Sequence, residues 1–387
     1  MIEYFPKNYV WNLSVNIALA MGANPGEVDI MCRRLVEASE RAQDGGTDDF
    51  LRVWCEQADR LVELAEEDLA QGRRLSAGTK LGRAATYYLT AERMQSVDHE
   101  PRKAIYRRTL DCFARFIELN DENCEVVEFP YEGKTLKGLF VSAGPKAPCM
   151  ALFNGLDSTK EMIYGCGWQQ ALARRGVSSI AIDQPGVGEA LRLQGLPAIV
   201  EAERWAGAAI DYLRTRADVD EAFIGCGAWS LGGYYAPRAA AMEPRFKLCV
   251  AWGANYDWGE MQHKRLAGQG DQPVPHYWKH VQWVWGKTTL EEFMDFVPQV
   301  TLAPVIERIR VPFLVAHGSN DRQIPVAYAH TQYEKAVNSP KRELKLFTPR
   351  EGGIEHCSAD NQTNARDYLC DWIAETFAEQ GAAGIRL

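Results

Sequence analysis

Apolar positions recur at helical spacing through about the first 120 residues of the chain. The pattern is clearest in four windows, at residues 28–36, 51–65, 81–89 and 105–117. Thr47, Asp48 and Asp49 offer side chains that can cap the second helix, and Pro101 can open the fourth. A polar stretch at residues 120–123 ends the pattern, so we predict a helical domain over residues 1–123.

From residue 124 the pattern changes to short β-rich runs that alternate with helical stretches. Residues 124–141 predict an antiparallel hairpin that turns at residues 132–134. Further buried strands are predicted at residues 149–153, 177–182, 222–226, 248–252, 311–316 and 343–347. This alternation is typical of an α/β domain, here an eight-stranded, mostly parallel sheet with helices on both faces over residues 124–387.

The alternation breaks at about residues 255–300, which we interpret as a helical cap inserted into the α/β domain. Aromatic side chains gather there among polar, proline and glycine residues: Trp258, Trp278, Trp283, Trp285, Phe293 and Phe296. Aromatic residues line ligand pockets, but an insertion also uses them for its own small core. The sequence leaves both interpretations open.

Composition and charge narrow the classes of function. The 387 residues carry a formal net charge of -9, and no basic stripe reverses this field locally. We therefore expect neither nucleic acid nor a membrane as a partner. No apolar run reaches the ~20 residues that span a bilayer, and the first residues lack a signal-peptide pattern, so we expect a cytoplasmic protein.

The ten cysteines are scattered along the chain without a C-x-x-C motif. Several fall inside apolar periodic runs, which is typical of reduced, buried thiols. Their spacing indicates neither disulfides nor a metal site, and we expect no cofactor and no metal.

A candidate nucleophile follows the strand predicted at residues 222–226. The letters A-W-S-L-G-G occupy residues 228–233, ahead of a segment that can form a helix. A nucleophilic serine on a tight strand-to-helix turn needs small side chains two positions before and two after it. Ala228 and Gly232 satisfy this need, although Ala228 departs from strict G-x-S-x-G. These letters can also mark a mere helix start, but the strand before them favours Ser230 as the nucleophile.

A serine hydroxyl needs a base to take its proton and a carboxylate to orient that base. In this architecture the expected chain order is serine, acid, histidine. Asp321 follows the strand at residues 311–316, where it could alternatively cap the segment from Pro325. Of the seven histidines only His356 follows the last predicted strand, in a glycine-rich loop. We therefore predict a triad of Ser230, Asp321 and His356.

The other histidines have simpler interpretations. His317 comes directly after a strand and before a glycine, so we expect it to make structural hydrogen bonds. His263, His276 and His280 fall in the cap and could touch substrate, but we interpret them as surface histidines because the sequence offers them no partner.

The tetrahedral intermediate of such a reaction needs two backbone N–H donors. We predict Leu231, after the nucleophile, and Leu156, in the loop after the third strand, where Gly155 lets the backbone approach closely. Asp157 lies in the same loop, and a carboxylate near an oxyanion is costly unless it has a task. It could instead cap the next helix, since D-S-T-K-E is a good helix start.

A glycine-rich loop, D-Q-P-G-V-G, occupies residues 183–188. Its spacing fails G-x-G-x-x-G, and no P-loop lysine follows. We interpret it as a tight structural turn beside the site.

Four motifs together resemble one branch of the α/β-hydrolases: N-G-L-D-S-T-K-E at 154–161, D-Q-P-G-V-G at 183–188, W-S-L-G-G-Y-Y at 229–235 and G-S-N-D at 318–321. This branch contains 2,6-dihydropseudooxynicotine hydrolase, the fungal polyketide-shortening hydrolases of the yellowish-green pigment type and the fermentation-respiration switch protein. The resemblance spans most of the chain and includes the helical N-terminal domain. It implies the α/β-hydrolase fold.

The resemblance implies hydrolysis of a carbon–carbon bond next to a ketone, with the helical domain covering the site and often taking part in dimerisation, so we expect a homodimer. It also implies a catalytic role for Asp157, because the nicotine-pathway relative has a glutamate in the matching loop that faces the triad. We expect substrate contacts from Trp229, Tyr234, Trp258 and Trp283.

These predictions combine in one hypothesis, in which Ser230 attacks a ketone and a carbon leaving group departs. A carbanion is too basic to leave unaided, so the expected substrate is a 1,3-diketone or an acyl-phenol-like compound of polyketide or alkaloid type. An esterase or lactonase with the same triad is the alternative. A non-catalytic receptor that keeps the fold and captures a ligand under the cap is the alternative of another class.

Overall fold

The computed structural model describes residues 1–41 and 44–387, which divide into two compact units. The helical unit comprises Met1–Cys124 together with Gln272–His280. The α/β unit comprises Glu125–Asp271 and Val281–Leu387. A short piece of the predicted cap thus belongs to the helical unit, which sequence periodicity gave no reason to expect.

The helices of the helical unit are α1 (Tyr9–Ala20), α2 (Pro25–Arg33), α3 (Val36–Ser39), α4 (Thr47–Ala70), α5 (Arg74–Arg93) and α6 (Arg102–Leu119). Helix α1 has no counterpart among the predicted windows, because its buried face includes polar residues. Asn12 accepts hydrogen bonds from the backbone N–H groups of Tyr4 and Phe5, and Asn16 accepts one from that of Ile2. Such satisfied amides interrupt the apolar period without opposing burial.

The predicted cap of α4 is wrong in detail. Its N-cap residue is Gly46, with φ of +85°, and no side chain caps the helix. Asp48 and Asp49 instead lie in the first turn, where the helix dipole favours negative charge.

The segment from the insertion is held in the helical unit by polar contacts. The His276 N–H donates to Asp44 Oδ1 at 2.7 Å, and His276 Nε2 lies 3.2 Å from Thr47 Oγ1. Lys279 forms an ion pair with Asp98. His276 is therefore partly exposed but has polar partners, whereas His280 is buried and His263 is exposed as predicted.

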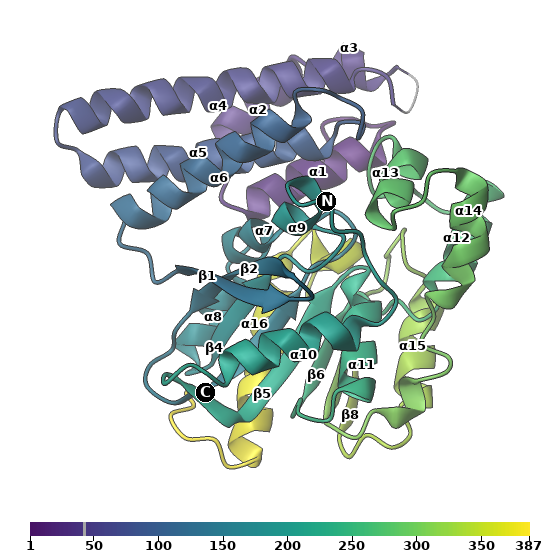
Figure 1. The fold of residues 1–387 in the computed structure, drawn as a ribbon. Helices are drawn as coiled ribbons and strands as arrows, with labels where there is room; N and C mark the ends of the chain where they lie inside the picture. Colours follow the sequence, from purple (N-terminus) through teal and green to yellow (C-terminus); the bar gives the residue numbers. More distant parts are fainter. Residues whose placement is uncertain (42–43) are drawn as a thin grey trace. The chain divides into compact units, whose positions relative to one another are not determined.

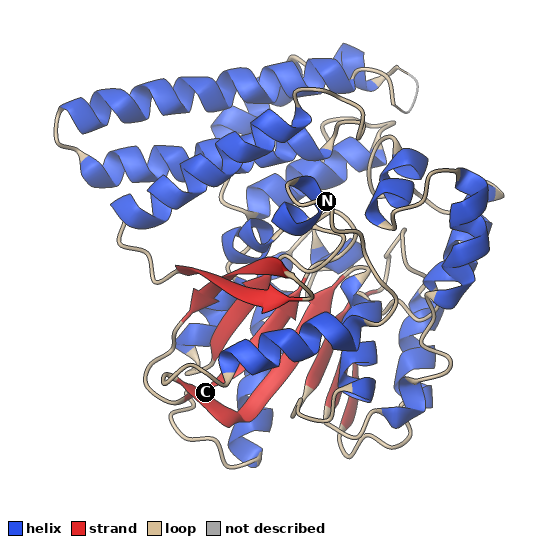
Figure 2. Ribbon diagram, in the orientation of Figure 1, coloured by secondary structure: helices blue, strands red, loops and turns tan. Residues whose placement is uncertain are grey.

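The α/β unit is built on an eight-stranded sheet in the order β1-β2-β4-β3-β5-β6-β7-β8 (Figure 2). The strands are β1 (Glu125–Tyr131), β2 (Lys134–Val141), β3 (Ala147–Phe153), β4 (Ser178–Ile182), β5 (Val219–Trp229), β6 (Cys249–Trp252), β7 (Phe313–Gly318) and β8 (Arg342–Phe347). Only the β1–β2 and β2–β4 pairs are antiparallel. The predicted α/β-hydrolase fold and its hairpin are confirmed.

Helices cover both faces of this sheet, as Figure 1 shows, with α10 (Ala202–Leu213) and α11 (Gly232–Met242) in front and α8 (Trp168–Arg174) and α16 (Gln362–Glu379) behind. Every residue of β3 and β4 is buried as a result. Strands buried on both faces read as continuous apolar runs, which is why the pattern located them. Helix α7 (Lys160–Gly165) precedes α8 in the β3–β4 connection, α9 (Gly188–Arg192) precedes α10 in the β4–β5 connection, and α15 (Val326–Lys335) connects β7 to β8.

The insertion carries α12 (Trp258–Leu266), α13 (Tyr277–Val284) and α14 (Leu290–Phe296). The Trp258 ring packs against Trp285 and edge-on against Phe293, with centroids 5.7 and 5.9 Å apart. All three side chains are buried. These aromatic residues therefore build the insertion's own small core, the second of the two interpretations of the sequence.

Two general features concern the described residues. No helix among them is both long and apolar enough to cross a membrane. All ten cysteines are free, and eight of them are buried, Cys55 and Cys124 being partly exposed.

Candidate active site

The three residues of the predicted triad follow three parallel strands of one sheet. Ser230 comes directly after β5, Asp321 lies in the loop after β7, and His356 lies in the loop after β8. Parallel strands end at the same edge of a sheet, which is where α/β proteins place their ligands. Chain segments far apart in sequence therefore meet at this edge.

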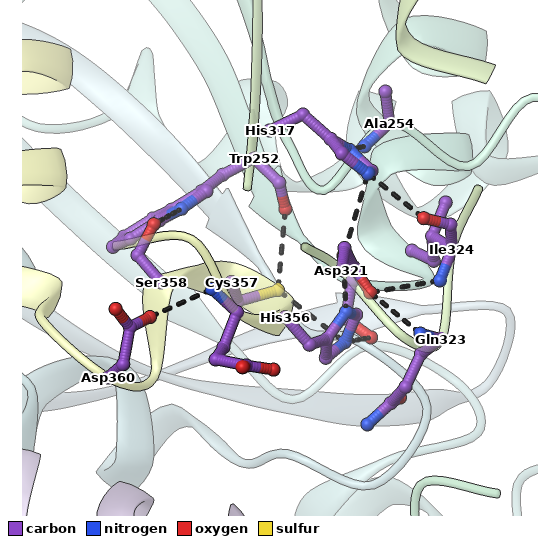
Figure 3. A network of polar contacts seen from close by, with 12 residues as sticks. Trp252, Ala254, His317, Asp321, Gln323, Ile324, His356, Cys357, Ser358 and Asp360 are labelled. Atoms are coloured by element: carbon purple, nitrogen blue, oxygen red, sulfur yellow. Dashed lines mark hydrogen bonds and ion pairs between the residues drawn. The ribbon is translucent and has the colours of Figure 1, made fainter. Parts of the chain in front are cut away.

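The side chains of these residues form one chain of hydrogen bonds. His356 Nδ1 lies 2.8 Å from Asp321 Oδ2, and His356 Nε2 lies 2.8 Å from Ser230 Oγ. With the ring proton on Nδ1 donated to the carboxylate, Nε2 is left to accept the Ser230 hydroxyl proton. Figure 3 shows His356 facing Asp321 at the centre of a wider polar network. The arrangement is that of a nucleophile, a base and an orienting acid.

The backbone of Ser230 is strained in the way a nucleophile elbow requires. Its φ is +59°, a left-handed value that a non-glycine residue rarely adopts. Its N–H donates to Trp252 O at 2.9 Å on the next strand. A Cβ on Gly232 would lie 2.5 Å from the Ala228 Cβ, so this turn closes only because Gly232 has no side chain. Ala228 in place of the usual glycine is accommodated.

The carboxylate of Asp321 is fully buried, and both of its oxygens accept hydrogen bonds. Oδ2 accepts from His356, while Oδ1 accepts from the backbone N–H groups of Gln323 and Ile324 at 2.8 and 3.0 Å. Burial alone would raise its pKa, but the charge and hydrogen bond of His356 outweigh burial and lower the pKa to about 2. Asp321 does not cap α15, whose N-cap is Pro325 with no side-chain hydrogen bond.

The imidazole of His356 is buried, and burial alone would lower its pKa. The Asp321 carboxylate reverses this effect, and together with Cys357 it raises the pKa of His356 well above its usual value. Cys357 Sγ lies 3.6 Å from His356 Nε2, the same nitrogen that faces Ser230. The ion pair with Asp321 thus makes the ring a stronger base than a free histidine.

Asp360 holds the loop that carries His356, and sequence reasoning missed it. Its two carboxylate oxygens accept from the backbone N–H groups of Gly353, Ile354 and Glu355 at 2.8–3.1 Å. Beyond this cradle, Cys357 and Ser358 have φ values of +48° and +56°. Only the pattern of two glycines followed by an aspartate a few residues later hints at such a cradle.

His317 serves structure, as expected. Its Nδ1 accepts from the Ala254 N–H at 3.0 Å, so its proton is on Nε2, which donates to Ile324 O at 3.0 Å. Burial lowers the pKa of His317, which keeps the ring neutral. His317 thus fixes the acid loop through Ile324, and its Nε2 also lies 3.6 Å from Asp321 Oδ2.

The loop after β3 lies against the nucleophile. A Cβ on Gly155 would lie 2.8 Å from the Ser230 Cβ, so only a glycine permits this approach. Within residues 1–41 and 44–387, neither the Leu156 nor the Leu231 N–H donates to a protein acceptor. Both predicted oxyanion donors therefore keep an N–H group for a ligand. Asp157 is partly exposed and is not the N-cap of α7, which is Thr159.

Three of the four predicted substrate contacts are core residues. The Trp229 ring packs near Trp168 and Trp252, and its Nε1–H donates to Ser158. Tyr234 is fully buried, and its hydroxyl donates to Val200 O at 3.0 Å. Trp258 belongs to the core of the insertion. Packing accounts for the burial of these three rings, and Trp283, which is partly exposed, stays a predicted substrate contact.

A buried ionic cluster connects the loop that carries Leu156 to residues 183–189. The glycine-rich loop at residues 183–188 is therefore more than a structural turn. The Lys160 ammonium contacts Glu161, Asp183 and Glu189 at 2.6–2.9 Å. Asp183 also accepts from the backbone N–H groups of Lys160 and Glu189, at the starts of α7 and α9. Burial raises the pKa of Glu161 despite the lysine. The three carboxylates could chelate a metal, but Lys160 already supplies a cation there.

The sequence of the chain is similar to those of known proteins. Residues 206–380 match the model of the prolyl oligopeptidase family. The chain is 25% identical to 2,6-dihydropseudooxynicotine hydrolase of Paenarthrobacter nicotinovorans over 84% of this chain and 83% of the relative. It is 26% identical to 20-hydroxy-prefusarin hydrolase of Gibberella moniliformis, over 87% and 90%.

A solved structure shows the same fold. The crystal structure of 2,6-dihydroxy-pseudo-oxynicotine hydrolase matches with a TM-score of 0.75 at 22% identity, over 96% of this chain and 98% of that chain. The match thus covers nearly all of both chains.

Replacing Lys160 by methionine should destabilise the protein strongly. Glu161 and Asp183 would lose their ammonium partner and Glu189 one of its two, and breaking a buried ion pair from one side costs about 3–5 kcal/mol. Denaturant unfolding measures the change. Lys137→Met is the control, because Lys137 pairs with Glu189 at 3.2 Å but is a third exposed and should cost about 1 kcal/mol or less. Equal losses in both variants would contradict the cluster's role.

Gly232→Ala should abolish the reactivity of Ser230 with a fluorophosphonate, because the new Cβ would collide with that of Ala228. Adding Ala228→Gly should recover part of it by removing the nearest obstacle. Gly227→Ala is the control, since a Cβ there would meet ordinary contacts at 3.4 Å and beyond. Labelling followed by mass spectrometry measures the outcome, and full labelling of Gly232→Ala would refute the steric argument.

The rate of fluorophosphonate labelling should rise with pH through a midpoint above 6.5. The base form of His356 exists only above its pKa, which the Asp321 carboxylate raises. Asp321→Asn should move this midpoint to lower pH, because burial then acts without the opposing charge, and should slow labelling by about 10⁴-fold. A midpoint that is unchanged by Asp321→Asn would contradict the assignment.

Proposed function

We propose that this chain, which has the α/β-hydrolase fold and resembles 2,6-dihydropseudooxynicotine hydrolase, hydrolyses a carbon–carbon bond next to a ketone, with Ser230 as the nucleophile. The observation that carries the proposal is the unbroken chain from Ser230 Oγ to His356 to Asp321, with 2.8 Å at each link. The reaction consumes one water and yields a carboxylic acid and a ketone or phenol.

In the first step His356 Nε2 takes the hydroxyl proton as Ser230 Oγ bonds to the substrate carbonyl carbon. The negative charge moves to the carbonyl oxygen, where the N–H groups of Leu156 and Leu231 receive it. Preorganised donors of this kind are worth about 10²–10³ in rate each. The Asp321 carboxylate stabilises the imidazolium that forms.

In the second step the intermediate collapses and the carbon–carbon bond breaks. Its electron pair departs with the carbon leaving group, which must be protonated as it leaves. We propose that Asp157 gives this proton, since it lies between Leu156 and Ser158 on the loop that approaches Ser230. The proton that His356 took from Ser230 then restores Asp157 to its protonated starting form, which leaves His356 neutral. Neutral His356 activates a water that releases the acyl group as a carboxylic acid, and the proton of this water returns through His356 to Ser230 Oγ.

The chemistry restricts the substrate class. An unstabilised carbanion is too basic to depart, so the leaving carbon must become an enolate or a phenolate-stabilised ring carbon. A 1,3-diketone or an acylated phenol satisfies this condition. An ester needs no such stabilisation, so ester cleavage by the same triad is the competing function.

A substrate panel separates the two functions. The purified chain would be given 1-benzoylacetone, an acylphloroglucinol and 4-nitrophenyl acetate, with products identified by mass spectrometry. We expect turnover of the first two and its loss by at least about 10³-fold in Ser230→Ala. Cleavage of the nitrophenyl ester alone would overturn carbon–carbon hydrolysis in favour of an esterase.

The same panel tests Asp157. Asp157→Asn should slow diketone cleavage by about 10²-fold, the usual contribution of a general acid, and leave the nitrophenyl ester almost unaffected, because nitrophenolate departs without protonation. Asp367→Asn, on the partly exposed surface of α16, is the control and should change neither rate. An equal effect of Asp157→Asn on both substrates would reject its role as proton donor.

A further inference from the structure

The hydroxyl of Ser158 joins the two halves of the site. We propose that Ser158 is a positioning residue, which sets the oxyanion-binding loop in register with the nucleophile elbow and so places both oxyanion donors. The inference rests on the proposed function, because it takes the N–H groups of Leu156 and Leu231 as those donors.

Ser158 Oγ makes three hydrogen bonds, the full capacity of a hydroxyl. It accepts from the Gly155 N–H at 2.9 Å and from Trp229 Nε1–H at 2.9 Å. It donates to Asn154 Oδ1 at 2.7 Å. The side chain is buried, so none of these bonds is replaced by solvent in the folded chain.

The two donors to Ser158 stand next to the two reacting parts of the site. Gly155 directly precedes Leu156, the proposed donor of the loop, and Trp229 directly precedes Ser230, the nucleophile. A single oxygen atom thus fixes the distance between two segments that are far apart in sequence. Because its hydroxyl is saturated by these partners, Ser158 can act on the substrate only through them.

Asn154, which accepts from Ser158, connects the loop to the sheet. Its Nδ2 donates to Ile182 O at 2.8 Å, at the end of β4. Its backbone N–H donates to Gln184 Oε1 at 3.1 Å, and its backbone oxygen accepts from Gln184 Nε2 at 3.0 Å. The loop is therefore anchored on one side to β4 and on the other, through Ser158, to the end of β5.

The hydrogen bond of the Gly155 N–H also determines which amide of the loop can bind an oxyanion. Three successive amides, of Gly155, Leu156 and Asp157, could in principle turn toward an oxyanion. Ser158 accepts a hydrogen bond from the first of them, which orients the following peptide plane and leaves the Leu156 N–H available as an oxyanion donor. Loss of the hydroxyl frees the Gly155 amide, and the loop can then rotate away from its catalytic orientation.

A displaced oxyanion donor affects the transition state more than the bound substrate, because the full negative charge on oxygen exists only after Ser230 has attacked. Ser158→Ala should therefore lower kcat by about 10- to 100-fold while KM stays within about twofold. The pH midpoint of the rate should not move, because Ser158 has no contact with Asp321 or His356.

The experiment compares Ser158→Ala with Trp229→Phe and with the double variant. Trp229→Phe removes the N–H donor from the other end of the same hydrogen bond and keeps a large aromatic ring. If the bond sets the register, the loss in the double variant should be clearly smaller than the product of the two single losses. Losses that multiply would overturn the proposal.

Ser178→Ala is the matched control. Ser178 is a fully buried serine whose hydroxyl accepts from the Ala143 N–H at 2.9 Å, and it lies at the start of β4, at the opposite end from Ile182. Ser158→Ala and Ser178→Ala should lose comparable stability in thermal unfolding, but only Ser158→Ala should lose kcat. Equal kcat in both would show that Ser158 is merely structural. If Ser158→Ala does not fold, Trp229→Phe against Ser178→Ala decides the same question.

Two readouts separate this proposal from the proposed function. All variants would be assayed with 4-nitrophenyl acetate as well as 1-benzoylacetone, because both reactions pass through an oxyanion. If the parent chain cleaves only the ester, carbon–carbon hydrolysis fails while the role of Ser158 is still measured. If Ser158→Ala cleaves both substrates at the parent rate, the positioning role fails alone.

Discussion

The ion-paired hydrogen bond between Asp321 and His356 is the interaction on which the site depends. It fixes the ring proton on Nδ1, turns Nε2 toward Ser230 and raises the basicity of the ring against the effect of burial. Its geometry in turn requires two loops, after β7 and β8, to keep their shape. His317 holds the first of these loops and Asp360 holds the second. The hydrogen bond between Asp321 and His356 therefore depends on residues of both loops.

The buried charges around Lys160 serve the loop that carries Leu156. The Lys160 ammonium pairs with the carboxylates of Asp183 and Glu189. Asp183 also accepts hydrogen bonds from the backbone at the starts of α7 and α9, and so connects these two helices. Together with the saturated hydroxyl of Ser158, this arrangement leaves the Leu156 loop little freedom. Catalysis of the proposed kind needs donors that do not have to reorganise as charge develops, and buried hydrogen bonds and ion pairs that hold a loop provide that stiffness.

Sequence alone predicted the strands and the three triad positions, because each of these leaves a local signature. A buried strand is an apolar run, and Ser230, Asp321 and His356 each follow one in the expected order. Asp360 and the Lys160 cluster were missed, since they act on backbone groups of loops whose meeting is decided only by tertiary structure. The sequence could not show that Trp229, Tyr234 and Trp258 are packed in a core, because apolar rings look alike in sequence whether they face a ligand or a core.

The crossing of Gln272–His280 into the helical unit has a consequence for how the chain can be divided. Val274 and Tyr277 within this segment are almost wholly buried, and its polar partners include Asp44 and Asp98 of the helical unit. A truncated protein that started at Glu125 would leave these apolar rings and methyl groups uncovered, and such surface promotes aggregation. The helical unit is therefore built from two separate stretches of the chain, and a cut at Glu125 would divide it.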